Sequence, residues 1–402
     1  MNQLIFFIKR VVIIFFLSPL YFFSKFIPRK RNLAVFGSFH LSFLDNSKYL
    51  FLQAQEYQEL KSIWISGKKE TVDKIRSYGF IAYRKWSLRG IYYCLTAKYY
   101  FYSAYITDIN LWTSGGATAM NLWHGTPLKA IEFDIKSGEI ANRFNGSLVS
   151  RIKYSNIYRK ANYIASTNRE VSEVFQSAFR LTPDQCLEFG YPRTDIFFKS
   201  ESEIIKHINI YETGSLKTLL GEIKNFKHKY IYMPTWRDDN SDFIKAGNWD
   251  LKKLNEIMVK TDSIFLFKMH VNTNWNSKII DNFSNIKAID NAIDVYPLLP
   301  FTTCLITDYS SIFIDYLLLD KEIIFFPFDK DNYLKMRPDF YFDYDELTDG
   351  LQVTENKKLL QLLEKPEKNN TSLSRKKLKK MFWNKNTPNA SKKILEHLIG
   401  NC

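Results

Sequence analysis

Residues 32–37 read Asn-Leu-Ala-Val-Phe-Gly, an uncharged and mostly apolar run that ends on a glycine. A short apolar run bounded by a turn residue predicts a buried strand. Similar runs recur at residues 62–65, 81–83, 99–102, 119–123, 163–165 and 188–191, with room for helices between them. Alternating strands and helices are typical of α/β proteins, so we expect a parallel sheet that is covered on both faces.

The strand pattern restarts after a polar, charge-rich stretch at residues 200–229 that reads as helical. Further buried strands are expected at residues 230–233, 263–268, 285–289, 304–307 and 322–326, and a helical tail at residues 373–398. Two successive nucleotide-binding-like halves suggest two Rossmann-like domains that face a cleft. We place these domains at residues 32–200 and 201–402, after a separate N-terminal segment at residues 1–31.

The composition limits the class of protein and its partners. Hydrophobic residues make up 46% and charged residues 24%, which excludes a wholly disordered, collagen-like or multi-span membrane protein. The net charge is +14, and residues 1–31 carry six basic and no acidic side chains, while residues 365–385 carry eight basic and one acidic. Basic clusters beside apolar segments are attracted to an anionic membrane surface. Nucleic acid is the rival partner, but the sequence contains no helix-turn-helix, zinc-finger or ribonucleoprotein-like motif, so we expect none.

The N-terminal segment is apolar from Leu4 to Phe23, but two basic residues interrupt it and leave an uncharged run of 13 residues. Spanning a bilayer takes about 20 residues. We therefore expect the segment to lie in the inner leaflet, with aromatic side chains at the interface and the basic cluster at residues 28–31 on lipid phosphates. A full span, a signal peptide and an N-terminal core helix are the alternatives.

A histidine, His124, follows the expected strand at residues 119–123 directly and precedes Gly-Thr-Pro-Leu-Lys. We expect the glycine to turn the chain, the threonine to cap and Pro127 to begin a helix, which would put His124 beside free helix amides. An imidazole that titrates near neutral pH can take a proton from an alcohol, and Lys129 adds a cation for a phosphate. A histidine satisfied within a turn is the alternative.

Two strands of the second half also end at basic side chains. Arg237 follows the strand at residues 230–233, and its guanidinium can hold a phosphate with two parallel hydrogen bonds. The neighbouring Asp238 and Asp239 permit a plain surface ion pair instead. His270 follows the strand at residues 263–268, so two histidines from two halves can face one cleft. A metal site would need a third ligand at regular spacing, which is missing.

Residues 307–311, Thr-Asp-Tyr-Ser-Ser, join a buried strand to an apolar helical segment. Ser310 or Ser311 can cap that helix, while the exposed amides and hydroxyls receive a second phosphate or a ribose. Asp308 and Asp315 are candidates for Mg²⁺, but such aspartates more often cap helices or form ion pairs, so we expect no cofactor and keep Mg²⁺ as the alternative. The sequence has no Walker or GxGxxG motif, which weighs against ATP hydrolysis and NAD-linked chemistry.

These motifs, together with the run Gly-Tyr-Pro-Arg-Thr-Asp at residues 190–195, have the order and spacing of the CDP-glycerol glycerophosphotransferase family. The chain resembles these bacterial enzymes, which prime and extend teichoic acids and similar capsular polymers, from about residue 32 to its C-terminal helix. The resemblance implies a GT-B fold, attachment to the cytoplasmic face of the cell membrane, and transfer of an alditol phosphate from a CDP-activated donor with release of CMP.

The resemblance also implies roles for single residues. His124 resembles the base that deprotonates the acceptor hydroxyl, and His270 resembles the second essential histidine, which would help to stabilise the transferring phosphate or the leaving CMP. The residues expected to bind substrate are Lys129, Arg193, Arg237, Thr307, Asp308, Ser310 and Ser311.

The sequence therefore predicts that a hydroxyl of a lipid-linked anionic acceptor attacks the β-phosphorus of CDP-glycerol in line. A CDP-ribitol donor, a GT-B glycosyltransferase that uses a nucleotide sugar, and a membrane-docked module that binds anionic polymers without catalysis are the alternatives. The length of the chain favours a primase or a short capsule transferase over a long-chain polymerase.

Overall fold

The computed structural model describes residues 2–237, 243–270, 273, 275–336, 339–348, 352–366, 372–384 and 388–400. These residues form two compact units. Unit 1 contains the described residues up to Thr126, residues 130–198 and the described residues after Phe382. Unit 2 contains residues 127–129 and 199–382.

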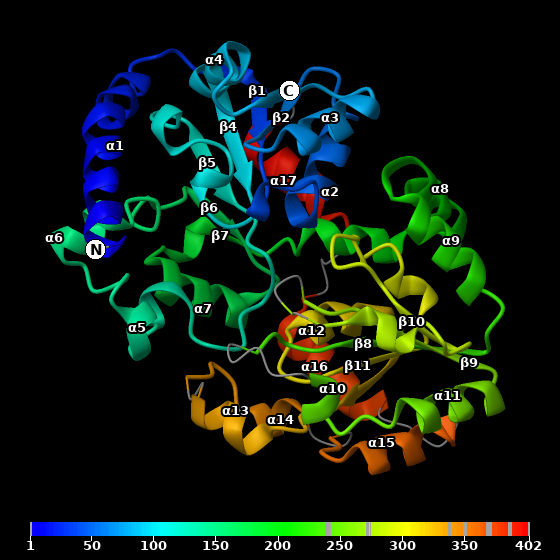
Figure 1. Cartoon of the computed structure of the whole chain (residues 1–402). Coiled ribbons are helices and arrows are strands. Elements are labelled where there is room, and N and C mark those ends of the chain that lie inside the picture. Colours follow the sequence, from blue (N-terminus) through cyan, green and yellow to red (C-terminus); the bar gives the residue numbers. More distant parts are fainter. Residues whose placement is uncertain are drawn as a thin grey trace. The chain divides into compact units, whose positions relative to one another are not determined.

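Unit 1 is built on a seven-stranded sheet whose pairings are all parallel (Figure 1). Its strands are β1 (Lys30–Phe36), β2 (Lys61–Ser66), β3 (Ala82–Arg84), β4 (Ala97–Tyr102), β5 (Thr118–Asn121), β6 (Tyr163–Ala165) and β7 (Cys186–Leu187), in the order β3-β2-β1-β4-β5-β6-β7. Their apolar side chains are buried, as both faces of the sheet are covered. The expected parallel α/β architecture is confirmed.

One strand of unit 1 lies elsewhere than the sequence predicts. The expected strand at residues 188–191 is wrong, because β7 ends at Leu187 and the chain then turns. Gly190 has a φ of +90°, which removes this residue from extended geometry, and its N–H donates to the carbonyl of Ser166.

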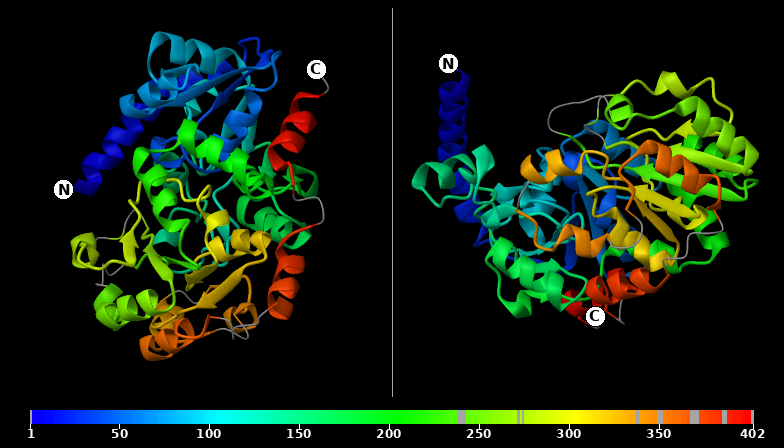
Figure 2. Two further views of the ribbon diagram at one scale, coloured as in Figure 1. Left: turned by 90° about the vertical axis from the view of Figure 1, so that its right-hand side faces the viewer. Right: turned by 90° about the horizontal axis from the view of Figure 1, so that it is seen from below.

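Helices pack against this sheet from the segments between the strands. They are α2 (Asp45–Ala54), α3 (Lys69–Ser77), α4 (Leu88–Thr96) and α7 (Arg169–Phe179). Two of these helices have N-cap residues of the usual kind. The side chains of Ser87 and Asn168 accept hydrogen bonds from backbone amides in the first turns of α4 and α7. Two short helices follow, α5 (Gly138–Ala141) and α6 (Leu148–Lys153), and α6 lies next to the long N-terminal helix α1 (Asn2–Ser24) (Figure 2).

The residues that follow α1 fasten it to unit 1. The guanidinium of Arg29 donates to the carbonyls of Cys94 (2.7 Å), Ala97 (3.1 Å) and Thr113 (2.8 Å). Burial lowers the pKa of Arg29. Arg29 belongs to the basic cluster expected to reach lipid phosphates, and that expectation is wrong for this residue because its side chain is committed to backbone carbonyls. Of the helices in the described ranges, none has both the length and the apolarity needed to cross a bilayer.

The C-terminal helix also departs from the expected domains. We expected residues after 201 to stay in the second domain, but α17 (Ala390–Ile399) belongs to unit 1. The carboxylate of Asp195 accepts the first two amides of α17, at 2.7 and 2.9 Å. The side chains of Ile394 and Leu395 are fully buried. The Asp195 carboxylate at the first amides of α17 and the apolar face of the helix together attach α17 to unit 1.

Unit 2 contains a second, five-stranded parallel sheet (Figure 1). Its strands are β8 (His228–Met233), β9 (Ser263–Phe267), β10 (Ile286–Ala288), β11 (Cys304–Thr307) and β12 (Glu322–Phe325), in the order β10-β9-β8-β11-β12. Its helices are α8 (Glu201–Tyr211), α9 (Gly214–Ile223), α10 (Phe243–Ala246), α11 (Leu251–Lys260), α12 (Ile312–Tyr316), α13 (Lys330–Met336), α14 (Tyr344–Leu347), α15 (Asn356–Leu363) and α16 (Ser372–Phe382). One face of the sheet carries an aromatic core of Tyr232, Trp249, Phe265, Phe267 and Phe326.

Candidate functional site

Both sheets reverse their strand order at one place, between β1 and β4 in unit 1 and between β8 and β11 in unit 2. In open α/β sheets, ligands bind outside the carboxyl ends of the strands at such a reversal. The loops after β4 and β5 carry Ser103 and His124, and the loops after β8, β9 and β11 carry Arg237, His270 and Asp308. The candidate residues of each unit therefore gather at the edge where a ligand is expected.

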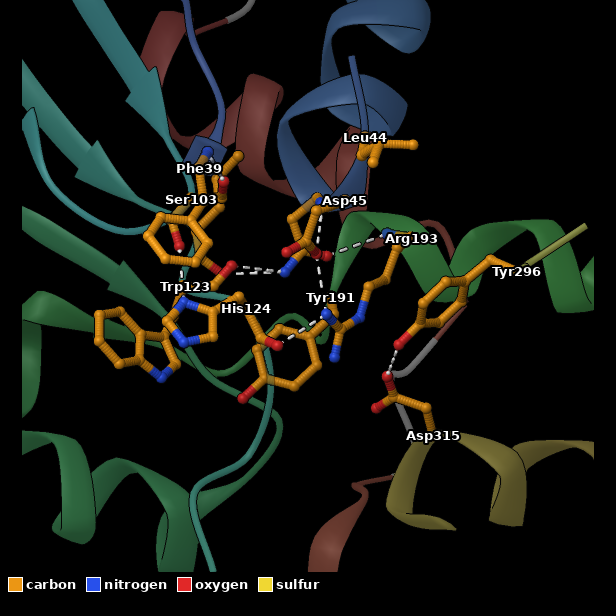
Figure 3. A network of polar contacts seen from close by, with 12 residues as sticks. Phe39, Leu44, Asp45, Ser103, Trp123, His124, Tyr191, Arg193, Tyr296 and Asp315 are labelled. Carbon is orange, nitrogen blue, oxygen red and sulfur yellow. Dashed lines mark hydrogen bonds and ion pairs between the residues drawn. The ribbon is translucent and has the colours of Figure 1, made fainter. Parts of the chain in front are cut away.

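His124 lies in unit 1 with its ring stacked on that of Phe39, at 5.5 Å between centroids and 11° between planes (Figure 3). Its Nδ1 lies 3.2 Å from the carbonyl of Ser103. A carbonyl can only accept, so this contact places the proton on Nδ1 and leaves Nε2 as the basic nitrogen. Desolvation by the surrounding protein lowers the pKa of His124, although Asp45 acts in the opposite direction. The lowered pKa favours the neutral imidazole, whose Nε2 can accept a proton, and the residue is exposed.

The helix expected to begin at Pro127 does not form. Residues 122–131 are irregular, and the next element is the 3₁₀ helix η4 (Glu132–Asp134). The backbone that would continue such a helix is paired elsewhere, because Leu128 accepts a hydrogen bond from the amide of Tyr341 and Lys129 forms an antiparallel bridge with Phe340. The phosphate site made of free helix amides beside His124 is therefore wrong.

Lys129 belongs to unit 2. Its Nζ donates to the hydroxyl of Tyr333 at 2.6 Å and lies 5.2 Å from the centre of that ring. Tyr333 stacks in turn on Tyr309, with 3.8 Å between centroids. The structure thus places the Lys129 cation against an aromatic stack of unit 2.

Arg193 is buried in unit 1, where its side chain supports the backbone of His124 (Figure 3). Its Nη1 donates to Oδ1 of Asp45 and to the carbonyl of His124, both at 2.8 Å. These contacts show that Arg193 holds the loop after β5 in place. Binding of substrate by Arg193 stays a prediction.

Arg237 and Asp308 form a buried ionic pair in unit 2. Arg237 Nη2 donates to Asp308 at 2.8 Å, and its Nε donates to Asp329 at 2.7 Å. Burial alone would lower the pKa of Arg237, but the two carboxylates outweigh it and raise that pKa. Asp238 and Asp239, the surface partners considered from the sequence, lie outside the described residues. Arg237 is therefore held inside unit 2, and a direct grip on phosphate stays a prediction.

His270 follows β9 by three residues and is exposed. Its carbonyl accepts from the side-chain amide of Asn291 at 3.2 Å, and its ring lies 6.4 Å from that of Trp236. Lys268, two residues before His270, contacts the same residue: its Nζ donates to the carbonyl of Asn291 at 2.9 Å. Burial lowers the pKa of Lys268 to about 8. The second histidine therefore lies on a loop that two hydrogen bonds to Asn291 connect to the segment after β10.

The remaining candidates lie around the end of β11. Thr307 is buried and its hydroxyl donates to the carbonyl of Met233 at 2.7 Å. Ser310 and Ser311 are half-buried in the turn before α12. Ser311 occupies the N-cap position, but its side chain forms no capping hydrogen bond, so the expected cap is wrong for that residue. Substrate binding by these hydroxyls stays a prediction.

The described residues contain no group of three or more His, Cys, Asp and Glu side chains that could hold a metal ion. Asp308 is paired with Arg237, and Asp315 accepts a hydrogen bond from the hydroxyl of Tyr296 at 2.6 Å.

Sequence reasoning missed several residues that shape the site. Asp45, Asn46 and Ser103 surround the loop of His124, and Asp329 completes the ionic cluster of Arg237. Ser103 follows the expected fourth strand directly, so its position at a strand end was a usable signal. An Asp-Asn pair before a helix reads as an ordinary cap, and it gives no sign of a contact with a distant loop.

Comparison with known proteins decides the family. Residues 20–400 match the profile of the CDP-Glycerol:Poly(glycerophosphate) glycerophosphotransferase family. The chain belongs to this family. The matched range begins within α1 and includes both sheets, so the family match extends over the two units apart from residues 2–19.

Individual members of the family extend the comparison. The chain is 30% identical to the teichoic acid glycerol-phosphate transferase of Staphylococcus aureus, over 83% of either chain. It is 26% identical to a teichoic acid poly(glycerol phosphate) polymerase of Bacillus spizizenii, over 93% of either chain, and it spans 44% of the corresponding Staphylococcus epidermidis polymerase. Among solved structures, that of the wall teichoic acid polymerase TagF matches with a TM-score of 0.74 and 26% identity, over 99% of this chain and 97% of the other.

Proposed function

We propose that this glycerophosphotransferase family member transfers glycerol phosphate from CDP-glycerol to a hydroxyl of a membrane lipid-linked acceptor, with release of CMP, in the synthesis of teichoic acid or a capsular polymer. The acceptor oxygen forms a bond to the β-phosphorus, and the bond from that phosphorus to the oxygen bridging to CMP breaks. The observation that carries the proposal is the exposed imidazole of His124 at the carboxyl edge of its sheet, whose Nδ1 lies 3.2 Å from the Ser103 carbonyl.

His124 supplies the base of this reaction. With Nδ1 donating to a backbone carbonyl, Nε2 takes the proton of the acceptor hydroxyl as that oxygen attacks phosphorus. General-base catalysis of this kind typically contributes about 10²–10⁴-fold. The backbone carbonyl of Ser103 orients the ring as a carboxylate does in other enzymes, and its hydrogen bond acts to raise the pKa of His124 without adding a full negative charge.

The donor is assigned to unit 2. His270 is exposed at the carboxyl edge of its sheet, and Ser310 and Ser311 follow β11 at the same edge, with β8 between β9 and β11. Side-chain and backbone donors at this edge suit the charged oxygens of a diphosphate, and His270 would stabilise the transferring phosphate or the leaving CMP. The GT-B arrangement expected from the sequence, in which both units serve one cleft, is part of this proposal.

The proposal also includes attachment to the cytoplasmic face of the membrane. Large apolar side chains are exposed on α1, among them Phe15, Phe16 and Phe23, and on α6, where Leu148 and Val149 are exposed. The two helices lie next to each other in unit 1 (Figure 2). Their side chains line an apolar groove of about 620 Å³. An exposed apolar patch beside basic residues suits the interface of an anionic bilayer.

The transfer reaction is tested with purified protein, CDP-glycerol and a lipid-linked acceptor that carries a terminal alditol phosphate. We expect CMP release that depends on the acceptor, a product heavier by one glycerol phosphate in mass spectrometry, and a loss of at least about 100-fold in His124→Ala. CDP-ribitol in place of CDP-glycerol tests the alternative donor, and a UDP-sugar tests a glycosyltransferase. Equal CMP release by wild type and His124→Ala would remove His124 from the mechanism.

Membrane attachment is tested by sedimentation with vesicles. We expect the chain to bind vesicles containing phosphatidylglycerol, to bind pure phosphatidylcholine less, and to lose binding as salt increases. The double variant Phe15→Ser and Phe16→Ser should reduce binding. Recovery of the wild type in the supernatant with both kinds of vesicle would contradict the attachment.

A further inference from the structure

The loop that carries His124 has a backbone that its own sequence does not favour. Trp123 adopts a φ of +49°, in the left-handed region that a bulky residue rarely occupies. The side chain of Asn121 caps this turn by accepting the amide of Trp123 at 2.9 Å. Such a conformation persists only where the surrounding structure determines it, and in functional sites it serves to aim a side chain. Another residue must therefore hold the positive φ of Trp123.

Asn46 is the residue that reaches this turn from a distant part of the chain. It is fully buried at the start of α2. Its Nδ2 donates to two consecutive carbonyls, those of Leu122 (3.1 Å) and Trp123 (2.9 Å). Its Oδ1 accepts the amide of Arg193 at 3.1 Å. A single side chain therefore joins α2, the loop after β5 and the segment after β7.

The chemistry of this contact suits asparagine in particular. A primary amide offers two N–H donors and one acceptor in one plane, and all three are used. Aspartate would turn both donors into acceptors against carbonyl oxygens, and serine would supply one donor. Arg193, which Asn46 holds through its amide, donates to the carbonyl of His124 at 2.8 Å (Figure 3). The carbonyls of Leu122, Trp123 and His124 are thus fixed in succession.

We propose that Asn46 is a positioning residue that holds the strained turn before His124, so that Nδ1 of the imidazole meets the Ser103 carbonyl and Nε2 faces the acceptor hydroxyl. The inference rests on the proposed function for the role of Nε2. Asn46 itself touches no reacting atom, because its three hydrogen bonds are all to backbone groups. Its loss frees the turn, and the imidazole loses the contact that selects its tautomer.

The experiment compares Asn46→Ala with Asn110→Ala. Asn110 is also fully buried in unit 1, but its side chain caps only its own turn through the amide of Trp112. Asn46→Ala should lose more thermal stability than Asn110→Ala, because it removes three hydrogen bonds and Asn110→Ala removes one. Only Asn46→Ala should reduce kcat. We expect a loss of about 100-fold, because a catalytic group misplaced by about 1 Å costs that much, and an unchanged KM for CDP-glycerol. Asn46→Ser, which keeps one donor and more of the fold, is measured beside it and should lie between wild type and Asn46→Ala.

A second readout does not depend on turnover. The ¹⁵N signals of the His124 ring, assigned by difference from a His124→Gln sample, should report the Nδ1–H tautomer in wild type and in Asn110→Ala. In the Asn46 variants the signals should move toward the Nε2–H tautomer. A wild-type tautomer and kcat in Asn46→Ala, or an equal loss of kcat in Asn110→Ala, would overturn the inference. If the wild type itself releases no CMP from CDP-glycerol, the proposed function fails, and the tautomer still decides whether Asn46 positions the ring.

Discussion

Replacement of Arg237 by alanine should destabilise unit 2 strongly. Removing one member of a buried ion pair costs about 3–5 kcal/mol, since the partner charge stays buried. Two features indicate that the cost of Arg237→Ala lies at the lower end of this range of free energies. Asp308 is 0% exposed but keeps the amides of Thr235 and Tyr309 as donors, and Asp329 is 21% exposed and can be hydrated. We therefore expect a loss of about 3 kcal/mol.

Urea unfolding measures this loss. For a slope of about 2 kcal/mol per molar urea, a loss of about 3 kcal/mol lowers the midpoint by about 1.5 M. Lys358→Ala is the matched control in the same unit, because its ion pair with Glu355 is exposed at 58% and 59% and should contribute below about 0.5 kcal/mol. A midpoint for Arg237→Ala equal to that of Lys358→Ala would refute the reasoning that the buried cluster supports unit 2.

Three further predictions concern unit 1. Asp45→Asn should move the acid limb of the kcat/KM profile to lower pH, because Asp45 raises the pKa of His124 and its removal lowers that pKa further. Glu132→Gln should flatten the dependence of the melting temperature on pH: burial raises the pKa of Glu132 to about 7, so the stability it contributes is fully present below about pH 4.5 and is lost as pH rises through 7. Asp195→Ala should cost about 1 kcal/mol in urea unfolding, since it leaves the first amides of α17 without their acceptor, and an unchanged midpoint would count against this cap.

The strands were predictable because each is a short apolar run that needs no information from elsewhere in the chain. Eleven of the twelve strands overlap the ranges expected from the sequence, and the exception is β7, where Gly190 turns a run that looked extended. The positions of His124 and His270 after buried strands followed from the same pattern. Local sequence was therefore enough to place the candidate residues at the carboxyl edges of the two sheets.

Long-range partners were not predictable. Pro127 has the sequence of a helix start, but the chain there pairs with Phe340 and Tyr341, which lie more than 200 residues away. Arg237 reads as an exposed cation next to two aspartates, yet it is paired with Asp308 and Asp329. In each case a tertiary contact outweighs a local preference, and no local signal reports the partner.

The return of α17 to unit 1 has a consequence for how the protein is made. During synthesis, the strands of the first sheet leave the ribosome well before α17, which packs against α2 and follows the whole of unit 2. The carboxylate of Asp195 and the apolar surface that receives Ile394 and Leu395 meet their partners only once the segment after unit 2 has been translated. Unit 2, whose residues are contiguous apart from residues 127–129, can complete its folding first. Loss of the terminal helix would then leave the earlier half unfinished and the later half intact.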